Sequence, residues 1–303
     1  MRKLHIKQQQ HPQQSHGLRW RLQQYALLVR LHRPIGTLLL LWPTLSALWI
    51  AAEGFPGWTL FMVFLLGTLL MRSAGCAIND YADRNIDRHV SRTRERPLTS
   101  GIITESEALA VAGTLALLAF LLLFLTNATT ILLSFVGLLL AIIYPFSKRF
   151  TNLPQLFLGA AFSWGIPMAY TAVGVPLQKT TWLLFIASVL WALVYDTLYA
   201  MVDREDDLKI GVKSTAILFG EADVLIVSII QIMVLLTLLL VGRQLGMSLY
   251  YYLGLLVASG FAVYQFTLIR KREPQKCFAA FLNNNYFGLA VFAGIVLHYA
   301  VAV

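Results

Sequence analysis

The chain has 303 residues, of which 58% are hydrophobic and only 13% are charged, and its formal net charge is +9. A soluble domain carries about a quarter charged residues, so this composition excludes an ordinary water-exposed globular protein. Apolar runs recur along the whole chain, each near the roughly 20 residues that a bilayer-spanning helix needs. Because lipid forces every backbone polar group to be paired within a helix, the sequence predicts an all-α polytopic membrane protein.

The first 24 residues differ from the rest of the chain. They are polar, rich in Gln and His and free of acids, and we predict a disordered tail there. They contain no short apolar core with a cleavage site, so they do not fit a removable signal peptide. Residues 25–303 are predicted to form one transmembrane domain, since no linker rich in Gly, Ser or Pro divides them.

Apolar runs and their interruptions predict about nine transmembrane helices. They lie at about 25–52, 58–82, 105–126, 129–146, 153–174, 181–202, 222–241, 249–269 and 283–302. Nine spans place the N-terminal segment and the loops near 83–104, 147–152, 203–221 and 270–282 on one side of the membrane. Of the 24 Lys and Arg residues, 21 lie on that side, so the N-terminus is predicted to be cytoplasmic. The gathering of Lys and Arg on one side accounts for the positive net charge, so no nucleic-acid partner is expected. The expected partner is the lipid bilayer.

Eight of the 15 acidic residues fall in two short stretches. The first runs from Asn79 to Asp87, directly after an apolar run. Asn79, Asp83 and Asp87 are spaced four residues apart, so on a continuing helix they line one face at about 6 Å per step.

The second stretch runs from Asp196 to Asp207. Asp196, Tyr199 and Asp203 share a helix face, which continues to either Asp206 or Asp207. Three adjacent acids end the stretch and leave open which of them lies on that face. Both stretches follow even-numbered spans at the predicted cytoplasmic side, so both reach the same membrane level.

Two facing clusters of carboxylates would repel each other unless a cation lay between them. Oxygen ligands of this kind suit Mg²⁺, which keeps several waters and bridges to substrate phosphates. The alternative is that the acids pair with neighbouring Arg and Lys on solvated helix ends. However, Asn79 and Asp196 lie within or beside apolar runs, and ionisable residues inside a membrane point to function by default. The sequence therefore favours a magnesium and phosphate site.

Basic residues complete this candidate site. Lys148 and Arg149 end the fourth span on the same side, where they fit either a diphosphate clamp or a topology anchor. Arg72 lies two turns before Asn79 inside a predicted span, so it should face a polar cavity and meet an anionic group. Arg30, at the start of the first span, is ambiguous between a membrane anchor and the site.

These residues resemble the intramembrane aromatic prenyltransferases, in particular the bacterial branch that acts on 4-hydroxybenzoate in ubiquinone synthesis. The stretches Asn79–Asp87 and Asp196–Asp203 carry the resemblance to the superfamily, and Arg33–Thr44 narrows it to the branch. Further matching stretches are Arg96–Gly101, Tyr144–Arg149, Lys213–Ala216 and Asn283–Tyr286. The similarity extends from about residue 25 to the C-terminus.

The resemblance implies a nine-helix bundle around a central cavity that is capped on the cytoplasmic side. It also implies Mg²⁺-dependent transfer of a polyprenyl chain from polyprenyl diphosphate to 4-hydroxybenzoate, at the ring carbon ortho to the hydroxyl. The residues that match its metal-diphosphate and basic motifs are Asn79, Asp83, Asp87, Asp196, Asp203, Asp206 or Asp207, Lys148 and Arg149. A bacterial inner membrane is the expected location, and the mitochondrial inner membrane is the weaker alternative.

Roles for individual residues follow from this implied chemistry. Mg²⁺ would make the diphosphate a better leaving group, and we expect Asp83 and Asp203 to be indispensable for that step. Tyr199 shares the acidic face and is expected to stabilise the allylic cation through its ring. Arg72 and Arg30 are the candidates for holding the carboxylate of the aromatic acid.

Other functions remain as alternatives. Relatives in the same superfamily prenylate other acceptors, in menaquinone, haem O or lipid synthesis. A cation transporter also uses intramembrane acids, but near mid-bilayer rather than at helix ends. A CDP-alcohol phosphatidyltransferase pairs acidic motifs with Mg²⁺, yet it has fewer spans and a different motif order. The apolar wall residues show no pattern that predicts the length of the prenyl chain.

Overall fold

The computed structural model describes residues 17–89 and 93–301, and in these ranges the chain forms helices and turns without any strand. The helices are α1 (Leu18–Leu28), α2 (Ile35–Ala51), α3 (Trp58–Asp83), α4 (Glu105–Leu122), α5 (Ala128–Ser147), α6 (Pro154–Ser163), α7 (Gly165–Val173), α8 (Lys179–Ile210), α9 (Thr215–Phe219), α10 (Asp223–Gln244), α11 (Leu249–Ile269) and α12 (Pro274–Val301), with single 3₁₀ turns η1 (Asp87–His89), η2 (Leu123–Leu125) and η3 (Gly220–Ala222).

Eight helical segments among the described residues are long and apolar enough to cross a membrane. The pair α6 and α7 counts as one of them, because the helix only bends at Trp164. The prediction of an all-α, multi-span membrane protein is therefore confirmed. The remaining apolar helix, α2, has 17 residues, which is short for a span, and so the ninth span stays a prediction.

The start of the chain differs from the sequence prediction. The single helix expected over 25–52 is wrong, because α1 ends at Leu28 and α2 begins at Ile35. Arg30 has a left-handed backbone with φ +57°, and Pro34 disfavours helix in the residue before it. Helix α1 also begins at Leu18, inside the segment that was predicted to be disordered. Residues 1–16 lie outside the described residues.

Two helices are longer than their apolar runs. Helix α8 has 32 residues and α12 has 28, so residues 203–210 and 274–282, which were predicted as loops, are helical. Hydropathy marks only the part of a helix that contacts lipid, and a charged continuation in the headgroup region is invisible to it. This extension keeps the whole second acidic stretch on one rigid helix.

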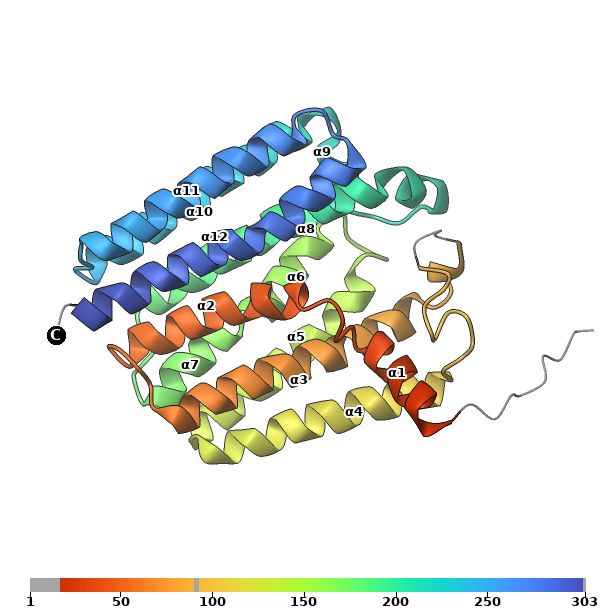
Figure 1. The fold of residues 1–303 in the computed structure, drawn as a ribbon, viewed down its shortest axis with the longest axis horizontal. Coiled ribbons are helices and arrows are strands. Elements are labelled where there is room, and N and C mark those ends of the chain that lie inside the picture. Colours follow the sequence, from red (N-terminus) through yellow and green to blue (C-terminus); the bar gives the residue numbers. More distant parts are fainter. Residues whose placement is uncertain (1–16, 90–92, 302–303) are drawn as a thin grey trace, which may run out of the picture.

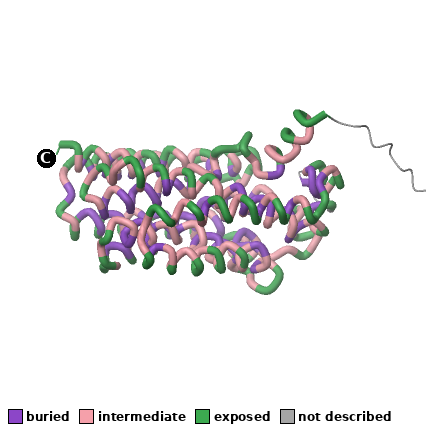
Figure 2. Tube along the Cα trace, turned by 90° about the horizontal axis from the view of Figure 1, so that it is seen from below, coloured by how far each residue is buried: buried purple, intermediate pink, exposed green. Residues whose placement is uncertain are grey.

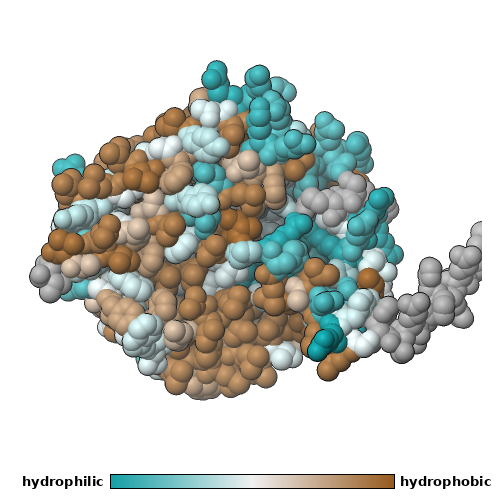
Figure 3. All heavy atoms as spheres, in the orientation of Figure 1, coloured by the Kyte–Doolittle hydropathy of each residue, from teal (hydrophilic) through white to brown (hydrophobic). Residues whose placement is uncertain are grey.

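The long helices run side by side, and α1 lies across one end of the bundle (Figure 1). Exposed positions follow the outer faces of the helices, and buried positions lie between them (Figure 2). Hydrophilic residues gather at the end that carries α1 and the connection from α3 to α4, while the rest of the visible surface is mostly apolar (Figure 3). This division is what a bilayer on the apolar part would require.

Helices α2, α8 and α12 form the centre of the largest hydrophobic cluster. Trp191 of α8 lies there, and its indole Nε1 donates a hydrogen bond to the buried Asn284 of α12 at 2.8 Å. Gly288 allows this close packing, since a Cβ atom on it would lie 2.6 Å from atoms of both Trp191 and Trp42. The acid-bearing helix α8 is therefore fixed in the middle of the bundle.

Candidate active site

A cavity of about 960 Å³ begins among charged residues at the polar end of the bundle and continues between apolar walls. Its lining comes from helices α2 to α8, the end of α1 and the loop after it, the connection between α3 and α4, the loop between α8 and α9, and Phe278 and Phe281 of α12. Seven predicted site residues of the two acidic stretches contribute to it: Asn79, Asp83, Asp87, Asp196, Tyr199, Asp203 and Asp207. The structure thus brings the two acidic stretches to one cavity.

The first acidic stretch does not continue as an α-helix. Helix α3 ends at Asp83, and Asp87 lies on the 3₁₀ turn η1, so the expected continuous face from Asn79 to Asp87 is wrong. Asp87 nevertheless lines the cavity, because Arg96 holds it through an ion pair at 2.7 Å. Burial raises the pKa of the Asp87 carboxyl, and the guanidinium of Arg96 opposes this rise. The turn therefore places a third oxygen donor beside the helix end.

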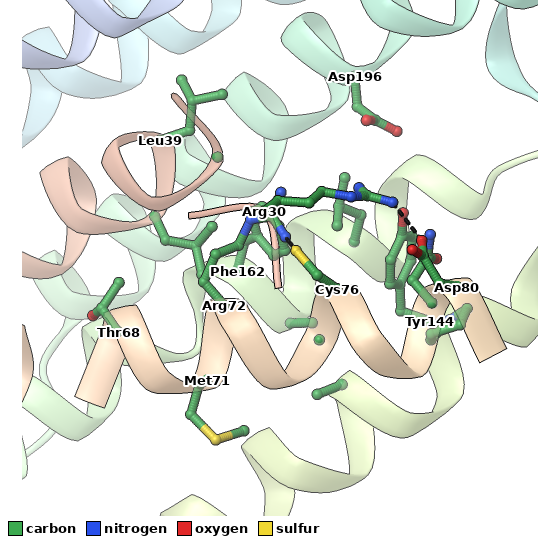
Figure 4. Close-up of a pocket in the computed structure, with 18 of the residues that line it drawn as sticks. Arg30, Leu39, Thr68, Met71, Arg72, Cys76, Asp80, Tyr144, Phe162 and Asp196 are labelled. Carbon is green, nitrogen blue, oxygen red and sulfur yellow. Dashed lines mark hydrogen bonds and ion pairs between the residues drawn. The ribbon is translucent and has the colours of Figure 1, made fainter. Parts of the chain in front are cut away.

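Asp80 and Arg96 are site residues to which no role was assigned from the sequence. Asp80 is 1% exposed, and its Oδ1 accepts from Arg30 at 2.6 Å (Figure 4) and from Arg96 at 2.9 Å. Arg96 therefore joins Asp80 to Asp87 and ties the turn back to α3. The sequence contained a signal for Arg96. This residue opens the matching stretch Arg96–Gly101 and follows the first acidic stretch closely enough for its guanidinium to reach the carboxylates.

The second acidic stretch behaves as its spacing predicts. Asp196, Tyr199, Asp203 and Asp207 all lie on α8 and all line the cavity. Asp206 does not line it and instead faces Lys209 at 3.4 Å on an exposed surface. The sequence left open whether Asp206 or Asp207 continues the face of Asp196 and Asp203. In the structure Asp207 lies on the cavity side of α8, and Asp206 does not.

The two basic residues at the end of α5 point in different directions. Lys148 lines the cavity and forms an ion pair with Asp83. Arg149 does not line it; its guanidinium donates to the carbonyl of Ala82 at 2.5 Å and lies over the ring of Phe146. Arg149 therefore caps the end of α3, and of these two basic residues Lys148 alone lines the cavity.

Arg72 and Arg30 both reach the cavity from different elements (Figure 4). Arg30 is paired with Asp80, and that carboxylate raises the pKa of its guanidinium against the lowering effect of burial. Arg72 donates to the sulfur of Cys76, while its Nε is buried without a hydrogen-bond partner. Its guanidinium lies against Gly36 of α2, where a Cβ atom would come within 2.3 Å. Arg72 thus retains a donor for an anionic group.

Comparison with known proteins identifies the fold and the family. The pattern of the UbiA prenyltransferase family matches residues 40–292. The chain belongs to the UbiA prenyltransferase family. It is similar to a Marinobacter nauticus protein named 4-hydroxybenzoate octaprenyltransferase, with 57% identity over 281 residues that cover 92% of this chain and 96% of that protein.

Solved structures of other UbiA proteins share the fold. The apo UbiA homologue from Aeropyrum pernix K1 has a TM-score of 0.77 at 22% identity, over 86% of this chain and 97% of that one. The homologue from Archaeoglobus fulgidus bound to GPP and Mg²⁺ has a TM-score of 0.69 at 18% identity, over 89% of this chain and 99% of that one. The resemblance inferred from the aspartate stretches is confirmed at the level of the family.

The residues of this UbiA-family site fit a magnesium ion that is held together with a phosphate group. Oδ1 of Asp83 is buried without a hydrogen-bond partner, which costs about 1–3 kcal/mol unless a cation or donor reaches it. Among the described residues, no three acid, His or Cys side chains converge closely enough to hold a metal alone. Mg²⁺ usually binds through one or two carboxylates, waters and substrate phosphates, so this spread is what the ion requires.

Proposed function

We propose that this chain transfers a polyprenyl group, octaprenyl by analogy with its named relatives, from polyprenyl diphosphate to 4-hydroxybenzoate. The group would join the ring carbon ortho to the hydroxyl, with release of diphosphate, as a step of ubiquinone biosynthesis. One observation carries the proposal: two acid-bearing helices, α3 and α8, and Lys148 face the charged end of a cavity whose other walls are apolar. A diphosphate fits the charged end, and a prenyl chain fits the rest.

The donor diphosphate would be held by both acidic stretches through Mg²⁺. The proposed ligand set is Asn79, Asp83, Asp87, Asp196, Asp203 and Asp207. When bound, Mg²⁺ neutralises the diphosphate and makes it a better leaving group. Lys148, now paired with Asp83, would turn to a diphosphate oxygen when the metal reaches that carboxylate.

Tyr199 would stabilise the allylic cation that remains when the carbon–oxygen bond to diphosphate breaks. Tyr199 lines the cavity on the same face of α8 as the acids, and its ring contacts that of Phe281, which also lines the cavity, with centroids 4.9 Å apart. An aromatic face attracts a cation by about 2 kcal/mol or more when the contact is desolvated.

Arg72 would hold the carboxylate of 4-hydroxybenzoate. Arg30, the other candidate, already pairs with Asp80, whereas Arg72 has a buried donor without a partner. An anchored benzoate would present its phenol ring to the cation, and the new carbon–carbon bond would form ortho to the hydroxyl. The ring proton would then pass to a cavity carboxylate or to the released diphosphate.

The proposed location is the inner, cytoplasmic membrane of a bacterium, with the polar end of the bundle and the N-terminus on the cytoplasmic side. Support comes from the eight membrane-length helices and from the Lys and Arg bias of the loops.

A reconstituted assay tests this function. The purified protein, given geranyl diphosphate, Mg²⁺ and 4-hydroxybenzoate, should form the 3-geranyl product. Dihydroxynaphthoate offered in the same assay tests the closest alternative acceptor. Product with dihydroxynaphthoate alone, or no product with either acceptor, would overturn the proposal.

A further inference from the structure

A buried amide at the start of α6 lies beside the second acidic stretch and has no part in the chemistry proposed above. Gln155 is the second residue of α6, next to Pro154, and is only 4% exposed. It lines the cavity, as does Asp196 of α8. A buried amide needs hydrogen-bond partners for its oxygen and its nitrogen, because an unpaired polar atom inside a protein is costly. These partners show which parts of the site Gln155 connects.

The main chain fixes the orientation of this amide. Oε1 of Gln155 accepts a hydrogen bond from the backbone N–H of Thr215, the first residue of α9, at 3.2 Å. A backbone N–H can only donate, so the oxygen of the amide must face Thr215. The carboxylate of Asp196 takes a side-chain hydrogen bond from Gln155. Nε2 is the atom of the amide that remains to donate this bond.

Two threonines close these contacts into a ring. Thr197 follows Asp196 on α8, and its hydroxyl donates to the carbonyl of Leu193 at 2.6 Å. The hydroxyl of Thr215 lies 2.7 Å from that of Thr197 and is the donor of this pair, since Thr197 already donates to Leu193. Both threonines are fully buried. We call Asp196, Gln155, Thr215 and Thr197 the Gln155 ring, which joins α6, α8 and α9.

The ring also gives a role to a sequence stretch that had none. Lys213–Ala216 is one of the stretches that resemble the prenyltransferases, and it supplies Thr215 to the ring. Lys213 and Ser214, directly before Thr215, line the cavity. Because Thr215 is fixed to both α6 and α8, the connection that follows α8 meets the cavity at a defined place.

Asp196 is one of the acids that the proposed function assigns to Mg²⁺. A carboxylate that binds a metal must present its oxygen at a defined position, and a hydrogen bond from a second side chain fixes that orientation. A neutral amide suits this task, since it donates to the carboxylate without a positive charge that would compete with the metal. The charged Lys148, in contrast, forms an ion pair with Asp83.

We propose that Gln155 is a positioning residue for the second acidic stretch. Its amide orients the carboxylate of Asp196 for Mg²⁺ and the diphosphate, and Thr215 holds the amide in place. This inference rests on the proposed function, since it assumes that a magnesium diphosphate binds at Asp196. It adds a determinant of metal binding on α6, a helix that carries no acidic residue.

Removal of the amide tests this role without turnover. Gln155→Leu should raise the Mg²⁺ concentration for half-maximal binding of tritiated geranyl thiodiphosphate by about 10- to 100-fold, the usual effect of losing a hydrogen-bond partner of a metal ligand. Gln265→Leu is the matched control, because Gln265 is 3% exposed and donates to Asn283 at 3.0 Å outside the cavity lining. The control should keep the wild-type Mg²⁺ dependence.

Gln155→Glu separates the contact with Asp196 from the contact with α9. The Glu carboxylate keeps an oxygen for the N–H of Thr215, but it has no hydrogen to donate to Asp196, and its charge repels that carboxylate. We expect the Mg²⁺-dependent binding of the analogue to be about tenfold weaker than in the wild type. If Gln155→Leu does not fold, Gln155→Glu decides alone.

The outcomes distinguish this inference from the function on which it rests. Wild-type Mg²⁺ dependence in Gln155→Glu, or in Gln155→Leu when it folds, would overturn the role of Gln155. Equal weakening in Gln155→Leu and Gln265→Leu would also overturn it, because any lost buried hydrogen bond would then have the same effect. Absence of Mg²⁺-dependent binding in the wild-type protein would instead refute the proposed function.

Discussion

At the scale of single residues, the site depends on which polar atoms remain without partners inside the protein. Oδ1 of Asp83 and Nε of Arg72 are both buried and unpaired, whereas Oδ1 of Asp80 is paired with both Arg30 and Arg96. A buried polar atom without a hydrogen bond costs about 1–3 kcal/mol, and bound substrate groups can remove this cost. We therefore propose that Asp83 and Arg72 bind ligands, whereas the ion pairs of Asp80 connect α3 with the segments that carry Arg30 and Arg96.

Asp83→Ala and Asp203→Ala should each lower kcat at least about 100-fold, because removal of one group that stabilises developing charge has an effect of that size. Asp206→Ala is the matched control, since Asp206 lies outside the cavity lining and, within residues 17–89 and 93–301, forms an ion pair only with Lys209. Turnover of the geranyl donor checks all three variants. If Asp83→Ala were about as active as Asp206→Ala, Asp83 would only be a charged residue at a solvated helix end.

Gly36→Ala should raise the KM for 4-hydroxybenzoate about tenfold, since a lost charge-assisted hydrogen bond costs about 1.5–3 kcal/mol. The added methyl would occupy the place of the Arg72 guanidinium, which would have to move. Gly113→Ala on α4 has open space around its Cβ and serves as the control. If Gly36→Ala raised the KM for the prenyl donor instead, the assignment of Arg72 to the acceptor would be wrong.

At the scale of elements, α8 must be held firmly, because it carries four of the predicted site residues that line the cavity and its end reaches beyond the apolar core. Arg204, next to Asp203, pairs at 3.0 Å with the fully buried Asp223 at the start of α10. Arg272 pairs with the other oxygen of Asp223 at 2.8 Å. Arg204 also donates to the carbonyls of Ala216 and Gly220. This cluster joins α8, α9 and α10 behind the site.

Asp223→Asn should lower the melting temperature in detergent by several degrees, since removal of one partner from a buried ion pair costs on the order of 3 kcal/mol. Glu273→Gln breaks the half-exposed pair with Lys276 and should change stability by less than about 1 kcal/mol. A melting temperature of Asp223→Asn equal to that of Glu273→Gln would mean that the cluster does not hold the bundle together.

At the scale of the whole molecule, the site forms where the charged end of the bundle meets its apolar interior. The acids come from two distant helices and are spread along the cavity wall rather than gathered at one point. Facing carboxylates repel each other, and Lys148, Arg30 and Arg96 now offset part of that repulsion. In the proposed function, Mg²⁺ and a phosphate group held between the two helices would neutralise the remaining charge.

Mg²⁺ together with a prenyl thiodiphosphate should therefore raise the melting temperature far more than Mg²⁺ alone. Ligand present at about 100 times its Kd stabilises the folded state by about 2.7 kcal/mol, whereas a weakly held ion adds little. Thermal unfolding in detergent, with Ca²⁺ or EDTA as controls, checks this expectation. The same rise with Mg²⁺ alone would show that the acids form a complete metal site without substrate.

The sequence alone determined the fold class, the protein family and most of the acidic residues that line the cavity. Apolar runs determine membrane helices because backbone groups must be paired in lipid, and a spacing of three and four residues on α8 determines which side chains share a face. Tertiary structure decided where helices end and which neighbours compete for each charge. The break between α1 and α2, the turn that holds Asp87, the pairing of Asp80 with Arg96 and the outward course of Arg149 all depend on contacts between distant residues.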